Sequence, residues 1–590
     1  MSINSAAYIA ISGMMATQVQ MEVASANISN ADTVGYTEKT AQQVSVVTGG
    51  MGAGTAISDI TGSVDKALMS SLVGATSDLG AANATNNYLG QLESLFGSVS
   101  GTDSTGTSLG NTLASLESAV STLEGTPNSA SLQANVVGSL NDALSQLQDT
   151  SSGIQDLRGN ANQDIATSVD DVNTQLQLIG SLNIQIQQAT ATNQPTGDLE
   201  DQRNTALQDV ASNLDVSYFT TSSGSLQVYT SSGQALVDTS VHQLSYTPAA
   251  NVTASTTYSA TPPSGFGGIM VNGVDITSQI QSGSIGALID LRDTSLPDAQ
   301  SQLDQLANQL KASVNAVNNQ GTSIPPPTSL TGTAAVSSTT PLAGSGTVRI
   351  AVADQSGNLV SYQDLNLSSY ATVGDLVSAI NGISGVSASI NSTGNVVIAS
   401  TDTSDGIAIN EMSSAVGANG QGLSDWLGLN DLITGSGASD IAVRSDVLNN
   451  PSLLATSTLD SSASPATGSQ VLSPGSTTAV DDLYQTLIGS TSFSTAGGLG
   501  STSTSFADYA ANIVGDVASK SSQASSDYTN KQTAQSYFSD TMSSESGVNL
   551  DQETARLSSL QNQYTASAEL LQVLNQMFTS LMTAVQSAAT

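Results

Sequence analysis

The chain has no cysteine, and its charges are few and mostly of one sign. Without cysteine it can form neither a disulfide framework nor a thiolate nucleophile. Charged residues make up 10% of the 590 positions, and 48 acidic residues against 11 basic ones give a formal net charge of −37. A chain this acidic repels phosphate backbones and anionic lipid headgroups, so we expect neither a nucleic-acid partner nor a membrane partner.

Histidine and cysteine, the usual zinc ligands, are also scarce. With one histidine, His242, and no cysteine, a zinc site would have too few ligands. Asp402, Asp405 and Glu411 surround Gly406, but their spacing does not match an EF-hand loop. The sequence predicts no metal site and no cofactor, with bound calcium left open.

Two glycine-containing motifs invite a catalytic interpretation, and neither has the required context. Residues 106–110 match G-x-S-x-G, but a nucleophile elbow needs a preceding strand, and 100–104 do not form one. Residues 50–54 are glycine-rich, yet no Lys-Ser/Thr follows, as a phosphate loop requires. The sequence therefore predicts a protein without catalytic residues.

The chain also lacks a visible cleavable signal peptide and a membrane span. Its first basic residue is Lys39, so the positive segment that opens a signal peptide is missing. Residues 570–590 carry no charge but hold nine polar side chains, which is too many for a membrane span. If the protein is extracellular, it must leave by a route that does not read a Sec signal.

The two ends of the chain share one apolar spacing. A repeat of 3.5 residues keeps one seam facing a neighbouring helix, as in a coiled coil. The N-terminal seam has many small side chains, and the C-terminal seam has large ones, so the two helices can interdigitate closely. The N-terminal seam comprises Ile3, Ala7, Ala10, Met14, Thr17, Met21, Ala24, Ile28 and Ala31, and the C-terminal seam comprises Leu557, Leu560, Tyr564, Ser567, Leu571, Leu574, Phe578, Leu581 and Val585.

An amphipathic helix usually just faces the core of its own domain. Here the stripes lie at the extreme termini, and their outward faces carry mostly Ser, Thr, Asn and Gln. Such a surface can pack against copies of itself without buried ion pairs or like-charge repulsion. The pattern favours packing between molecules.

Between the ends, helix-rich sequence brackets β-rich sequence, and residues 36–62 look extended and loop-like. Residues 63–65 can cap a helix that runs to about residue 96, and a broad apolar face predicts one very long helix over about 129–190, a rod of about 90 Å if unbroken. A hairpin is predicted over residues 225–237 and a further helix over 286–320. The predicted fold class is α+β multidomain, with paired terminal coiled-coil helices, a long-helix bundle and inserted β-rich domains. We expect four domains: 1–35 with 556–590 (terminal coiled coil), 36–214 with 286–324 and 480–555 (helical bundle), 215–285 (β-rich) and 330–470 (inserted mixed α/β outer domain).

One short motif is more specific than these patterns. The segment Asn27-Ile28-Ser29-Asn30-Ala31-Asp32-Thr33-Val34-Gly35-Tyr36-Thr37, after Ile11-Ser12-Gly13-Met14, resembles the N-terminal motif of bacterial flagellar rod, hook and hook-associated proteins. Gly35 is expected to supply a backbone turn, and Tyr36 to pack where the chain leaves the terminal domain. The candidate motif residues are Asn27, Ile28, Ser29, Asn30, Thr33, Gly35 and Tyr36.

Three further segments resemble the hook-associated protein 1 family, whose members form the first hook–filament junction. They are residues 198–203, residues 286–293 running into Leu296-Pro297, and residues 546–553 followed by Gln563-Tyr564. The resemblance covers about 1–325 and 480–590 and is weakest over 330–470.

The resemblance implies a structural subunit of the bacterial flagellum that serves motility and joins hook to filament. Such proteins are exported through the flagellar type III apparatus, become extracellular without a cleavable signal peptide, and pair their terminal helices on assembly as an inner tube. The implied partners are copies of itself in a ring, hook protein, the second hook–filament junction protein and an export chaperone before secretion. Two alternatives remain: another flagellar axial protein (hook protein or second junction protein), or a surface adhesin with a helical stalk, which would need a Sec route or an anchor.

Overall fold

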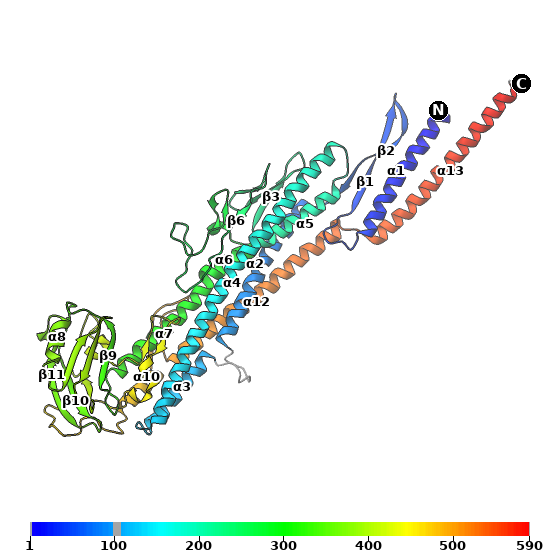
Figure 1. The fold of residues 1–590 in the computed structure, drawn as a ribbon. Coiled ribbons are helices and arrows are strands. Elements are labelled where there is room, and N and C mark those ends of the chain that lie inside the picture. Colours follow the sequence, from blue (N-terminus) through cyan, green and yellow to red (C-terminus); the bar gives the residue numbers. More distant parts are fainter. Residues whose placement is uncertain (1–2, 98–107, 589–590) are drawn as a thin grey trace.

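The computed structural model describes residues 3–97 and 108–588 and shows an elongated molecule (Figure 1). The N- and C-terminal helices lie side by side at one end. A long helical bundle forms the middle, and a β-rich domain lies at the other end. This arrangement agrees with the predicted α+β multidomain class.

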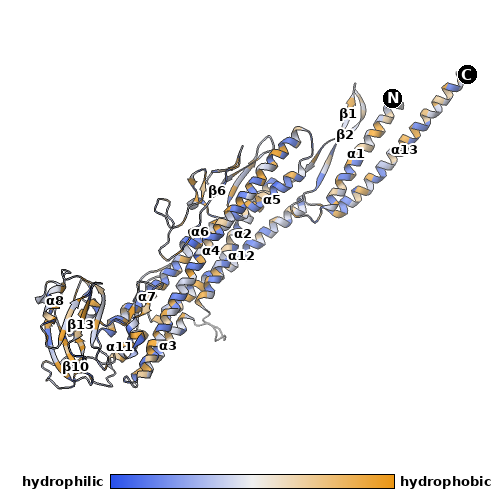
Figure 2. Cartoon of the chain, viewed as in Figure 1, coloured by the Kyte–Doolittle hydropathy of each residue, from blue (hydrophilic) through white to orange (hydrophobic). Residues whose placement is uncertain are grey.

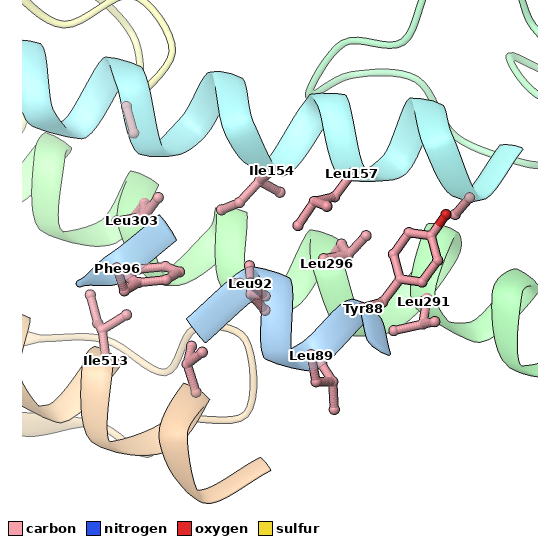
Figure 3. Close-up of a cluster of buried hydrophobic side chains, with 14 of the residues drawn as sticks. Tyr88, Leu89, Leu92, Phe96, Ile154, Leu157, Leu291, Leu296, Leu303 and Ile513 are labelled. Carbon is pink, nitrogen blue, oxygen red and sulfur yellow. The ribbon is translucent and has the colours of Figure 1, made fainter. Parts of the chain in front are cut away.

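The bundle is built around one very long helix, α4 (Ala130–Ala191). Its 62 residues are unbroken, which at ~1.5 Å per residue gives a rod of about 90 Å, as the sequence predicts. Figure 3 shows Leu92 and Phe96 between Ile154 on one side and Ile513 on the other in the shared core. The other bundle helices are α2 (Lys66–Phe96), α3 (Leu109–Glu124), α5 (Gly197–Asn213), α6 (Gly283–Asp290), α7 (Leu296–Asn318), α11 (Thr478–Ile488) and α12 (Phe506–Ser546).

Side-chain caps explain where these helices begin. The Asp65 carboxylate accepts hydrogen bonds from the backbone N–H groups of Ala67 and Leu68, which confirms the expected cap of α2. Ser129 caps α4 in the same way by accepting from Leu132. These local signals are readable in the sequence, and the predicted and observed starts agree closely.

The helix expected over 286–320 is interrupted. A π-helical turn, Leu291–Ser295, separates α6 from α7. Pro297 follows at the start of α7 and has no N–H to donate to the preceding turn, which accounts for the wider turn at this point.

The β-rich segment packs along α4. Strands β3 (Val216–Thr220), β4 (Leu226–Thr230) and β5 (Ala235–Val237) form one antiparallel sheet, so the predicted β4–β5 hairpin is confirmed. A second small sheet contains β6 (Leu244–Ser245), β7 (Met270–Val271) and β8 (Val274–Asp275).

Two buried arginines fix this segment to the bundle. Arg158 of α4 donates to the carbonyl oxygens of Thr253 (2.9 Å) and Thr256 (2.5 Å). The Arg292 guanidinium lies over the Phe266 ring, 4.5 Å from its centroid. Arg292 belongs to the segment 286–293 that the sequence analysis singled out.

The outer domain has a core of its own between two antiparallel sheets, and α8 (Val373–Ile380) packs against it. One sheet has the order β11 (Leu359–Asn366), β10 (Thr347–Asp354), β14 (Asp405–Asn410), and the other β12 (Val386–Ile390), β13 (Asn395–Ser400), β9 (Ser329–Ala335), with helix α9 (Leu423–Leu427) beside β9.

Part of the expected outer segment lies instead on the bundle. Strands β15 (Ile433–Thr434) and β16 (Ala442–Val443) and helix α10 (Ser445–Asn449) pack against α4 and α7. Their apolar side chains join the bundle core. A short hairpin, β17 (Thr491–Phe493) and β18 (Thr502–Thr504), connects α11 to α12.

The terminal limb consists of α1 (Ile3–Ser29), the hairpin β1 (Lys39–Thr48) and β2 (Met51–Gly62), and α13 (Leu550–Ala588). Residues 36–62, expected to be extended and loop-like and to belong to the bundle, are extended, but they form this antiparallel pairing and pack on α1. Gly49 and Gly50 both have positive φ (60° and 81°), which suits a two-residue hairpin turn.

Hydropathy along the limb differs from that of the bundle. Figure 2 shows apolar and polar patches along the full length of α1 and α13, although few neighbouring elements cover them. In residues 3–97 and 108–588, none of the helices combines the length and apolarity that a membrane crossing requires.

Candidate assembly surface at the terminal helices

Helices α1 and α13 pack on each other in opposite directions (Figure 1). Of the N-terminal seam, Ala10, Thr17 and Ala24 are buried, and Ala7, Met14, Met21 and Ile28 are half-buried. The side chain of Ile3 lies outside the described residues. On α13, Leu560 is buried, and Leu557, Tyr564, Leu571 and Leu574 are half-buried. The structure therefore brings most of the two predicted seams together.

The last three residues of the C-terminal seam are exposed to solvent. Phe578, Leu581 and Val585 are 46%, 52% and 59% exposed. Helix α13 has 39 residues against 27 in α1, so its last turns extend past the start of its partner. A contiguous apolar surface of this kind marks an interaction site.

The second face of α1, which the sequence analysis missed, packs on the hairpin. The Thr55 N–H donates to Ser12 Oγ at 3.1 Å, and Gln20 Nε2 donates to Gln43 Oε1 at 3.2 Å. A Cβ on Gly54 would collide with Ser12, so glycine permits this close approach. The available signal was weak, because the strand pattern of residues 39–62 lacks clear alternation.

Asn27 is the motif residue with the clearest structural role, because its side chain bonds to both Tyr36 and Lys39. Its Nδ2 donates to the Lys39 carbonyl oxygen (2.9 Å), and its Oδ1 accepts from the Lys39 N–H (3.0 Å) and the Tyr36 hydroxyl (3.0 Å). The side chain is fully buried. Asn27 thus fastens the end of α1 to the start of β1.

Lys39 and Asp201 then fasten the limb to the bundle. Asp201 of α5 accepts from the Thr37 N–H (2.9 Å) and the Thr37 hydroxyl (2.8 Å), and it forms an ion pair with Lys39. Lys39 and Asp201 are 5% and 7% exposed. We call Asn27, Tyr36, Thr37, Lys39 and Asp201 the hub. Segment 198–203 therefore contributes Asp201, the residue of the bundle that binds Thr37 and Lys39 of the limb.

The Tyr36 phenol is the remaining polar group of the hub, and the charges around it affect its pKa. Burial, and then the negative charges of Asp198 and Asp201, raises the pKa of Tyr36 to about 12. The phenol therefore stays neutral at ordinary pH and remains a donor to Asn27. The Lys39 ammonium lies 4.6 Å from the centroid of its ring, at cation–π distance.

The remaining motif residues stabilise the end of α1 locally. Ser29 Oγ and Asn30 Nδ2 donate to the carbonyl oxygens of Ser25 (2.9 Å) and Ala26 (3.0 Å). Thr33 Oγ1 lies 3.4 Å from Asn30 Oδ1. These side chains are not buried, and these hydrogen bonds lie within residues 25–33.

We expect Gly35→Ala to loosen the joint. Gly35 has φ +79°, and an added Cβ would lie 2.6 Å from Thr205 Oγ1. Backbone strain costs about 1 kcal/mol, and overpacking adds about 1–3 kcal/mol. The matched control is Gly50→Ala, because Gly50 has φ +81° and open space for a Cβ. Faster amide hydrogen exchange over 33–41 in the Gly35 variant alone is the expected result, and equal effects would contradict it.

A carboxylate pair lies where α13 begins. The Glu38 N–H donates to the Ser546 carbonyl oxygen (2.8 Å), and Arg556 Nη1 lies 3.8 Å from Glu38 and 3.4 Å from Glu553. Burial raises the pKa of Glu38, and the Glu553 carboxylate raises it further. This contact ties β1 to the α12–α13 turn.

The raised pKa gives a prediction with a definite sign. An acid whose folded-state pKa is raised loses stability as pH rises from its unfolded pKa through its folded pKa. Glu38→Gln removes that loss, so we expect slower amide exchange over 36–41 and 546–556 at pH 7 and no difference from wild type below about pH 4. Since the Glu38 side chain is 33% exposed and Arg556 offsets part of the effect, the gain should stay below about 1 kcal/mol. Faster exchange at pH 7 would show that the Arg556 pair dominates.

The acidic residues considered for calcium have structural partners. Glu411 accepts from the N–H groups of Leu423 (2.7 Å) and Ser424 (2.5 Å), and so holds the start of α9. In the part of the chain that the structure describes, no group of three acidic or histidine side chains is arranged to hold a metal ion.

Three family models match different parts of the chain. Residues 89–328 match the helical domain of flagellar hook-associated protein FlgK, which covers most of the bundle and the β-rich segment. Residues 8–37 match the flagella basal body rod protein model, and residues 540–584 match the C-terminal model of the flagellar basal body rod FlgEFG proteins. The last two matches fall on α1 with the motif and on α13.

A solved structure has the same fold. The flagellar hook junction protein FlgK from Burkholderia pseudomallei is 15% identical, with a TM-score of 0.50, and the match covers 80% of this chain and 100% of that one. No curated protein matches the sequence significantly. The matched helical domain, the matched termini and the shared fold agree with the motif residues that form the hub, and together they support a resemblance of this chain to flagellar hook-associated protein FlgK.

Proposed function

We propose that this protein is a structural, non-enzymatic subunit of the bacterial flagellum that forms the junction between hook and filament and assembles through its terminal helices. Its location in the flagellum and its interaction with other flagellar components follow from this resemblance. The four-domain division expected from the sequence is part of the proposal, with the hairpin assigned to the terminal limb and residues 433–449 to the bundle.

The observation that carries the proposal is the uncovered seam of α13. From Leu557 to Ala588 the helix has one charged residue, Glu569, and among the described residues its large apolar side chains from Phe578 onward are about half exposed. A lone helix with such a face is stabilised mainly by packing, so an assembled tube of terminal helices supplies what a single chain lacks.

The match of residues 89–328 to the FlgK helical domain supports the junction position over that of hook protein or the second junction protein. The two terminal matches do not separate these candidates, because they are to rod-protein models. The finer partners proposed here are copies of this chain in a ring, hook protein, the second junction protein and an export chaperone. Export through the flagellar type III route, without a cleavable signal peptide, would bring the protein outside the cell.

Immunogold electron microscopy on intact flagella of the source cells tests this function. We expect gold confined to the boundary between hook and filament. Gold along the hook or the filament would make the chain a bulk axial subunit. Gold on the cell body alone would favour an adhesin.

A further inference from the structure

The terminal limb has three layers. Helix α1 contacts β1 and β2 on one side and α13 on the other, so it separates the hairpin from α13 (Figure 1). Thr55 bonds to Ser12, and the position of a Cβ on Gly13 is 3.9 Å from Ser567 Oγ, which places the middle of the hairpin level with the middle of α13. The limb therefore presents two unlike flanks, the hairpin on one side and α13 on the other.

The hairpin flank is apolar, uncharged and open at its edge. Residues 40–58 include no charged side chain. The exposed fractions of Val44, Val46, Val47 and Met51 are 46%, 37%, 63% and 71%. Within the described residues, β1 pairs with β2 alone, so its outer edge is unpaired. A two-stranded ribbon is marginal in water, and an uncharged open edge invites another chain.

The α13 flank carries a second apolar strip, offset from the seam that faces α1. Leu570, Val573 and Met577 are each 51% exposed. They follow helical spacing, so they form one line along the helix. The line lies at and beyond the level of the hairpin, on the opposite side of α1.

Charge decides where two copies can approach. The chain has a net charge of −37, whereas residues 3–31 contain only Glu22 and residues 557–588 only Glu569. Like-charged bundles repel each other, and the limb is where that repulsion is weakest. Two nearly uncharged apolar flanks therefore suit a second copy of this chain better than a charged partner.

We propose that the hairpin flank of one copy packs on the α13 flank of the next copy. Because the flanks differ, the contact is heterologous, and its repetition generates a ring or a helical tube. A two-fold contact would instead place hairpin on hairpin. This inference rests on the proposed assembly through the terminal limb and names the surfaces that meet there.

The absence of cysteine makes the contact directly testable. We would introduce Val47→Cys and Met577→Cys together, produce the variant in cells that lack the wild-type protein, isolate hooks with attached filaments and oxidise them. The expected result is a ladder of covalent multimers on a non-reducing gel. Each single variant should stay monomeric. The control pair is Val47→Cys with Gln576→Cys, whose second site is next to the strip on a polar position.

Four outcomes would overturn the inference while leaving the junction function intact. These are dimers from Val47→Cys alone, covalent products with a different protein, equal ladders from the control pair, or junctions that contain the variant without any ladder. If wild-type protein itself is missing from the hook boundary, the proposed function fails instead.

A second arm covers the case in which the cysteine pair is not incorporated. Val47→Asp alone and Met577→Lys alone should each abolish or strongly reduce filament attachment, and the two together should restore it. Lack of restoration, with monomers that retain wild-type circular dichroism, would overturn the inference.

Discussion

Leu574→Asp is expected to leave the bundle and the outer domain folded and to stop the chain from assembling on hooks. Leu574 is a half-buried seam residue of α13, and none of the bundle core residues belongs to this helix. A carboxylate placed in an apolar seam costs about 2–3 kcal/mol, which lowers the association constant by roughly 100-fold. Electron microscopy and a motility assay of complemented deletion cells measure the result.

The matched control is Asn575→Asp, which adds the same charge one residue away on an exposed position of α13. It should assemble nearly as well as wild type. Circular dichroism of both purified monomers should match wild type, which separates assembly from folding. Normal filaments on Leu574→Asp cells would contradict an assembly role of the seam.

Asp201→Ala is expected to release the limb from the bundle. The substitution leaves the buried Lys39 ammonium without its counter-ion and removes both acceptors of Thr37. Breaking a buried ion pair by removing one partner costs about 3–5 kcal/mol. We expect amide exchange over residues 36–41 to become at least roughly 100-fold faster, since each 1.4 kcal/mol is about a factor of ten.

Asp198→Ala is the matched control on the same helix. Asp198 also lies near the Lys39 ammonium, at 4.0 Å, but its side chain is 75% exposed. An exposed partner contributes at most about 1 kcal/mol, so exchange over 36–41 should stay within about five-fold of wild type. Similar rates in the two variants would mean that the ion pair does not hold the joint.

The sequence predicted the helices well because their signals are local. The cap at Asp65, the apolar face of α4 and the terminal seams are each recognised from residues only a few positions apart. The motif Asn27–Tyr36 resembles that of flagellar axial proteins, and the matching rod-protein and FlgK models agree with this resemblance. Long helices with regular periodicity are specified by neighbouring residues, so a single sequence reveals them.

The contacts of the hub could not be predicted from such local patterns. Thr37 and Asp201 are 164 positions apart, and nothing in either neighbourhood indicates that they meet. The hairpin was missed because its strands mix apolar and polar side chains without regular alternation and are only partly covered, so the period-two pattern is weak. The interrupted helix at Leu291–Ser295 likewise depends on where Pro297 falls against the packed bundle.

The long helices, the two apolar terminal seams with almost no charge and the resemblance to flagellar axial proteins can all be recognised in the amino-acid sequence. The joint of Asn27, Lys39 and Asp201, the extension of α13 past α1 and the placement of the hairpin and α13 on opposite flanks of the limb become visible in the folded chain alone. The physical reason is that periodicity and capping are energies of adjacent residues, whereas a buried ion pair and an uncovered face depend on which distant segments the fold brings together.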